Sequence, residues 1–68
     1  MKHWYRFEAR VEGRREPMVD WYYGETETEA RAAWDEDAHR YGLPMGKTTV
    51  TVREATPEQA KALEGSNI

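Results

Sequence analysis

The chain has 68 residues, no cysteine, and a net charge of −3 from ten basic and thirteen acidic side chains. A chain this short buries only about 60% of the surface that its unfolded form exposes, and the lack of cysteine excludes disulfides and thiolate-bound zinc as sources of stability. Its first ten residues, MKHWYRFEAR, are too polar for a signal peptide or a membrane span. We therefore expect a cytoplasmic, non-membrane protein whose core depends on its aromatic residues.

The first third of the chain predicts a β-hairpin. Apolar and polar side chains alternate with period two over residues 3–11, the pattern of a half-buried strand. The segment EGRREP at 12–17 places charges between glycine and proline and is typical of a loop, and a second strand is expected over 18–23. The expected cross-strand pairs are Val11 with Val19, Ala9 with Trp21, and Phe7 with Tyr23.

A long helix is predicted over residues 27–41. Thr26 and Glu29 have the capping-box spacing, and Gly42 is suited to the left-handed position that ends a helix. At 100° per residue the helix has a narrow apolar stripe, expected to face the sheet. The stripe consists of Ala30, Trp34, Ala38 and Tyr41. Asp37 lies beside it, and two interpretations stay open: a carboxylate at a solvated margin, or one bonded to a donor such as a tyrosine hydroxyl.

The last third predicts one strand and one short helix. Residues 48–54, TTVTVRE, favour a strand, and Thr56 followed by proline favours a helix over 57–64, with the final GSNI expected to fray. The order β-β-α-β-α predicts an α+β fold in a single domain of residues 1–68. We expect a three-stranded, mainly antiparallel sheet with the first strand at the centre, the long helix packed on one face, and a short C-terminal helix.

The acidic residues are concentrated in one segment. Residues 20–37 hold seven acids and one arginine, and only some of those acids are explained by the helix dipole or by ion pairs at i,i+4 spacing. The excess predicts a surface that binds a basic partner. Its expected members are Glu25, Glu29, Asp35, Glu36 and Asp37, with Tyr22 as an aromatic anchor.

The sheet face away from the long helix is a second predicted surface. Aromatics interleaved with arginines on an open sheet are typical of single-strand RNA binders and of protein interfaces. The outward residues are expected to be Trp4, Arg6, Arg10, Tyr22, Thr49, Thr51 and Arg53. The negative net charge disfavours nucleic acid. Two further possibilities stay open: the C-terminal helix covers Trp4 and Tyr22, or two copies pair through this face or a free edge strand.

No catalytic constellation is evident, so we expect a protein that is not an enzyme and has no catalytic residue, cofactor or metal. The single serine, Ser66, and the two histidines have no motif around them. Asp35 and His39 have the i,i+4 spacing of a metal-binding pair, but no third ligand is evident.

The layout resembles that of small phage and mobile-element accessory proteins, anti-CRISPR proteins among them. The resemblance is one of format over the whole chain, with MKHWYRFEARVEGRREP as the hairpin and TETEARAAW as the capped helix. It implies a stoichiometric inhibitor that presents acids to a nucleoprotein or nuclease complex. The leading hypothesis is therefore a non-enzymatic protein-binding module that occludes a basic surface. The alternatives are a nucleic-acid-binding module using the outer sheet face and a homo-oligomeric structural module.

Overall fold

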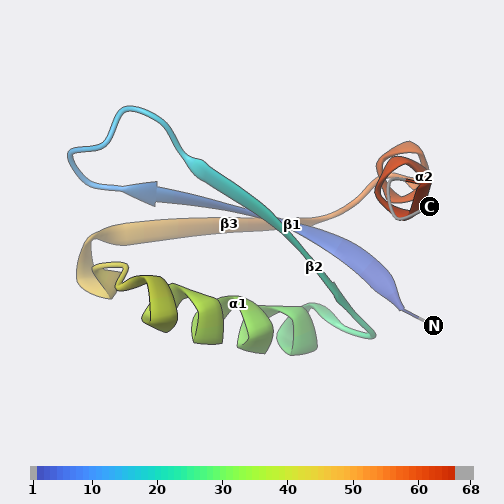
Figure 1. The fold of residues 1–68 in the computed structure, drawn as a ribbon, viewed down its shortest axis with the longest axis horizontal. Helices are drawn as coiled ribbons and strands as arrows, with labels where there is room; N and C mark the ends of the chain where they lie inside the picture. Colours follow the sequence, from blue (N-terminus) through green and yellow to red (C-terminus); the bar gives the residue numbers. More distant parts are fainter. Residues whose placement is uncertain (1, 66–68) are drawn as a thin grey trace.

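The computed structural model describes residues 2–65 and confirms the predicted α+β fold (Figure 1). Its elements are β1 (His3–Val11), β2 (Met18–Gly24), α1 (Glu27–Tyr41), the 3-10 turn η1 (Met45–Lys47), β3 (Thr48–Glu54) and α2 (Pro57–Gly65). The observed strand and helix bounds agree with the predicted ones to within one residue, and η1 is an addition. The expected fraying concerns residues 66–68, which lie outside the described residues.

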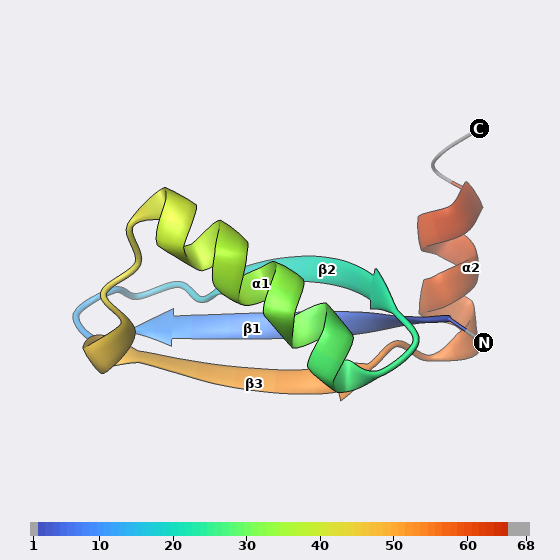
Figure 2. The same cartoon turned by 90° about the horizontal axis from the view of Figure 1, so that it is seen from below.

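The three strands form one sheet in the order β2-β1-β3. Both neighbours of β1 run antiparallel to it, so the prediction of a central first strand is confirmed. On one side of β1 the alternate side chains from Tyr5 to Val11 are all buried, and Tyr5, Phe7 and Ala9 pack in one cluster with residues of α1. Figure 2 shows α1 crossing this side of the sheet. We call this side the covered face and the opposite side the open face.

The predicted pairing of the hairpin is wrong. The observed pairs include Tyr5 with Tyr22, Phe7 with Asp20, and Ala9 with Met18. This register differs from the predicted one by three residues, and an odd shift moves every side chain of a strand to the opposite face. Tyr22 therefore lies on the covered face, whereas Trp21 and Tyr23 lie on the open face.

Gly24 explains which side of β2 faces the helix. It is buried where β2 meets the start of α1, and a Cβ added there would lie 3.2 Å from the Ala30 backbone nitrogen. Only glycine allows so close an approach between strand and helix without a shift of the backbone. Because side chains alternate along a strand, Gly24 on the covered face places Tyr22 there too and Tyr23 on the other side.

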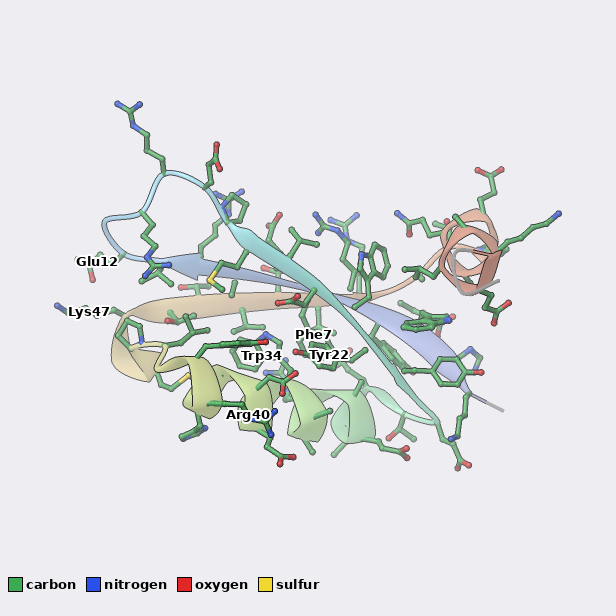
Figure 3. The ribbon with its side chains drawn as sticks, in the orientation of Figure 1. Phe7, Glu12, Tyr22, Trp34, Arg40 and Lys47 are labelled. Carbon is green, nitrogen blue, oxygen red and sulfur yellow. The ribbon has the colours of Figure 1, made fainter. Side chains whose placement is uncertain are left out.

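The core consists of aromatic rings from the sheet and the helix, together with alanines that allow the two layers to approach. Phe7 is fully buried. Its ring stacks on Trp34 with centroids 5.9 Å apart and meets Tyr22 edge-on at 5.4 Å, as Figure 3 shows. Such ring pairs add about 0.5–1.5 kcal/mol beyond the burial of their area. The buried cluster comprises Tyr5, Phe7, Ala9, Ala30, Trp34 and Ala38.

The ends of α1 follow the predicted capping, with one correction. The Thr26 hydroxyl accepts a hydrogen bond from the Glu29 backbone at 3.2 Å, and Gly42 adopts the left-handed conformation. Tyr41, expected in the core, is 70% exposed. Leu43 packs against the core instead, because its backbone nitrogen bonds to the Ala38 carbonyl in the Schellman arrangement and so turns the chain back toward the sheet.

The short helix α2 stands at one end of the sheet, beyond the start of β1 and on the side away from α1 (Figures 1 and 2). Its first turn has a complete capping box, in which Thr56 and Gln59 exchange side-chain hydrogen bonds with each other's backbone nitrogen. Ala60 and Leu63 are half-buried, and none of the residues of α2 is fully buried. Neither α1 nor α2 is long and apolar enough to cross a membrane.

Candidate functional site

The acid beside the apolar stripe of α1 is bonded to a tyrosine. The Tyr22 hydroxyl donates to an Asp37 carboxylate oxygen at 2.7 Å, and the other oxygen of Asp37 lies 3.9 Å from Arg40. Burial raises the pKa of Tyr22 above its usual range, and the Asp37 carboxylate adds to this effect. The tyrosine-bonded interpretation of Asp37 therefore holds, and this carboxylate helps to join α1 to β2.

The remaining acids of the predicted surface are spread around α1. Glu36 lies 3.7 Å from Arg40, which is the predicted i,i+4 pair. Glu25 and Glu29 are exposed near the start of the helix. Asp35 and Asp37 are about 200° apart around the axis at 100° per residue, so they lie on nearly opposite sides of it. The structure joins Tyr22, Asp37, Arg40 and Glu36 in one contact network and leaves the other three acids outside it.

His39, which has the i,i+4 spacing of a metal-binding pair with Asp35, makes a local contact within the helix. The His39 ring nitrogen lies 2.9 Å from the backbone carbonyl oxygen of Asp35, one helical turn earlier. Within residues 2–65, no three side chains of the metal-binding types come together.

The open face brings together side chains from all three strands, arranged in rows across the sheet. The register places Trp4 beside Tyr23, Arg6 between Trp21 and Arg53, Glu8 between Val19 and Thr51, and Arg10 beside Thr49. Of the outward residues predicted from the sequence, all except Tyr22 lie on this face. Trp21, Val19 and Tyr23 are members that the predicted register missed. The requirement for a small residue at Gly24 was the signal that could have identified them.

Two arginines on the open face are direct cross-strand neighbours. Arg6 on β1 pairs in register with Arg53 on β3. Like charges in this position are destabilising, in contrast to the opposite charges that usually occupy it. Glu8 offsets part of the repulsion, since its carboxylate lies 3.5 Å from Arg6 and 3.6 Å from Arg10. Within residues 2–65, Arg53 forms no ion pair.

Aromatic rings occupy the end of the open face nearest α2. The Trp4 and Tyr23 rings pack at 4.9 Å between centroids, and the Lys2 ammonium lies 5.8 Å from the centre of the Tyr23 ring. Tyr23 remains 47% exposed, and Trp21 is half-buried directly opposite Arg6. The face therefore presents π surface and guanidinium groups side by side.

The C-terminal helix does not cover this face along its length. The Ala55 nitrogen bonds to the Trp4 carbonyl at 2.8 Å, which anchors α2 at the start of β1. Trp4 is half-buried there, and its indole nitrogen is buried without a hydrogen-bond partner. Further along the sheet, Arg53, Thr51, Thr49 and Arg10 are exposed. The possibility that the helix covers Trp4 and Tyr22 together is wrong, because Tyr22 lies on the other face.

The two sides of the sheet differ in charge. The strand residues of the open face include three arginines, Arg6, Arg10 and Arg53, against one acid, Glu8. The residues of α1 include five acids and two arginines. The net charge of −3 therefore conceals a local excess of positive charge on the side away from α1.

Comparisons with protein-family models, curated proteins and solved structures found no match to this chain.

Proposed function

We propose that the open face binds single-stranded nucleic acid. The observation that carries this proposal is the row in which Trp21, Arg6 and Arg53 lie side by side on an uncovered sheet. A like-charge pair is a cost to the free protein, and a phosphate placed between the two guanidinium groups removes that cost. Bases stacking on an adjacent indole would add about 1–3 kcal/mol each.

The dimensions of the sheet support a short binding site. From Trp4 to Arg10, β1 extends for about 20 Å at 3.3 Å per residue. A strand laid along β1 meets aromatic rings at one end, then the arginine row, and then Arg10 and Thr49. The helix α1, which carries five acids, lies on the opposite side of the sheet from this path (Figure 1). The overall negative charge therefore does not prevent local attraction of phosphates.

The acidic surface of α1, with a basic protein as its partner, stays a prediction. Less of it is available than the sequence suggests, because Asp37 is already bonded to Tyr22. Glu29→Lys with Glu36→Lys would test it without disturbing the Tyr22–Asp37 bond. Unchanged binding of that double variant to a basic partner would exclude this surface.

The test of the proposed function is fluorescence anisotropy of a labelled 15-nucleotide single strand, oligo-dT or oligo-U, titrated with the protein at several salt concentrations. We expect the affinity to fall with salt by a log–log slope of about 0.7 per phosphate contacted. Arg53→Glu should weaken binding by about tenfold or more and reduce the slope, because a phosphate contact is replaced by repulsion.

Arg31→Glu is the matched control. It changes the net charge by the same amount but lies on α1, exposed and on the other side of the sheet. It should change the affinity by less than about twofold. Equal losses in the two variants would show only a general charge effect and would contradict the proposal, as would the absence of binding at low salt.

A further inference from the structure

A cavity of about 460 Å³ lies at the end of the sheet opposite α2, between the hairpin loop and the turn that leads into β3. Figure 3 shows Glu12 and Lys47, from these two segments, side by side at this end. The wall from the hairpin is Arg10 to Arg14, and the wall from the turn and β3 is Gly46 to Thr49. The volume falls within the roughly 300–1,000 Å³ of small-molecule sites.

Backbone hydrogen bonds hold the two walls together. The Glu12 nitrogen donates to the Lys47 carbonyl at 2.9 Å and joins the loop to the turn. The loop is closed by a bond from the Arg14 nitrogen to the Val11 carbonyl at 3.0 Å. Gly13 and Gly46 have no atom within 4 Å of where a side chain would begin, so both walls leave open space there. The two walls of the cavity therefore share a backbone frame that hydrogen bonds hold together.

The charge around the cavity is predominantly positive. Arg10, Arg14 and Lys47 line it, and Glu12 is the only acid that does. Of these cations, Arg10 is close to a carboxylate, that of Glu8 at 3.6 Å. Arg14 and Lys47 form no ion pair within residues 2–65. Three cationic residues therefore contribute to the lining, and their charge would attract an anion.

We propose that this cavity binds a phosphate group, with room beside it for an attached sugar. Arginine forks and lysine ammonium groups are the usual phosphate ligands of proteins. The inference deepens the proposed function and partly rests on it, because Arg10 and Thr49 belong to both the open face and the cavity. A strand on the face would reach the cavity as it leaves the arginine row. The phosphate is then a terminal or an internal one of that strand.

The experiment follows backbone amide signals by ¹H–¹⁵N NMR while inorganic phosphate is added at constant ionic strength. We expect shifts at residues 12–14 and 46–49 that saturate, and none with chloride. Three oligonucleotides then separate the sources: one with a 5′-phosphate, one with a 3′-phosphate and one with neither. Tighter binding of one phosphorylated form assigns the cavity to a strand end, and equal binding that needs a longer strand assigns it to an internal phosphate.

The variants compare two cations that line the cavity with one that does not. Arg14→Gln with Lys47→Gln should abolish the saturating shifts and weaken oligonucleotide binding by about tenfold. Arg15→Gln, in the same loop but outside the cavity, should leave the shifts unchanged. Shifts that persist in the double variant, or that never saturate, would overturn the phosphate site. Loss of oligonucleotide binding in Arg53→Glu separates the two proposals, since that variant should keep the response to inorganic phosphate.

Discussion

The covered and open faces of one sheet differ in how their side chains are packed, although β1 contributes to both. Along β1, Phe7 is fully buried under α1, and its neighbour Arg6 points away with its side chain 24% exposed. The covered side is built of complementary contacts between rings and alanines. The open side keeps a like-charge pair that folding alone would not favour. This difference indicates that different requirements determine the residues of the two faces.

The largest expected difference between the faces is in stability. Phe7→Ala should lower the free energy of unfolding by about 3–5 kcal/mol because it leaves a cavity against Trp34. This is most of the stability expected for a chain of this size. Tyr23→Ala, on the open face, should cost about 1 kcal/mol. Urea denaturation followed by circular dichroism measures both. Phe7→Leu should stay folded and give an intermediate value, and equal losses for Phe7→Ala and Tyr23→Ala would contradict the comparison.

A smaller effect concerns the hydroxyl that joins the covered face of β2 to α1. Tyr22→Phe removes the bond to Asp37 and should cost about 1 kcal/mol, because Asp37 keeps Arg40 and partial access to water. Tyr41→Phe is the control, since that side chain is 70% exposed. The midpoint temperature of thermal unfolding should be lower for Tyr22→Phe than for the wild type, and it should be unchanged for Tyr41→Phe. A wild-type value for Tyr22→Phe would mean that the bond adds nothing to stability.

The same tyrosine gives a pH dependence. The pKa of Tyr22 is raised in the folded protein, so above pH 10 the folded state holds a proton that the unfolded state has lost. Stability is therefore complete below about pH 10 and falls as the pH rises further, by up to about 1.4 kcal/mol per pH unit for this group. Burial raises the pKa of Tyr5 in the same direction. Denaturation at pH 9 to 11 should show a shallower loss in Tyr22→Phe, and identical slopes would count against this role.

The smallest effect has the opposite sign and lies on the open face. Arg53→Thr removes the like-charge neighbour of Arg6 and should raise the free energy of unfolding by about 0.2–1 kcal/mol while weakening nucleic-acid binding. Arg10→Thr controls for strand propensity, because Arg10 lies opposite a threonine and near Glu8 and relieves no repulsion when removed. The midpoints of urea denaturation compare the stabilities of the two variants. A loss of stability in Arg53→Thr would show that the arginine pair is not a cost to the free protein.

Most of the fold could be predicted from local signals. The strand and the two helices were predicted from residues that are close together in the chain. These signals are the alternation in 3–11, the Thr26 cap, the left-handed Gly42 and the Thr56 cap. The central place of β1 followed from the length and apolar inner side of that strand. Tyr41 was misplaced because helical spacing does not show where the chain turns back, which here allows Leu43 to complete the core.

The candidate site depended on register, which is a tertiary property. The hairpin loop permits more than one pairing, and choosing the wrong one moved Tyr22 outward and Trp21 inward. Arg6 and Arg10 were placed correctly, since the parity of β1 was unambiguous. The proposed phosphate site could not be predicted from the sequence, because its two walls, which include Arg14 and Lys47, are 33 positions apart and come together only when β3 pairs with β1.

One partner of β1 is close to it in the sequence and the other is far away, and this difference has a consequence for the order of folding. β2 pairs with β1 across a short loop and α1 follows at once, so the core around Phe7 can assemble from segments that are synthesised before β3. β3 pairs across separations of 37 to 49 positions and carries a larger loop-closure cost. We expect it to dock last. The arginine row and the cavity are completed only in that step, so a newly made chain would acquire the proposed binding surface at the moment its fold is finished.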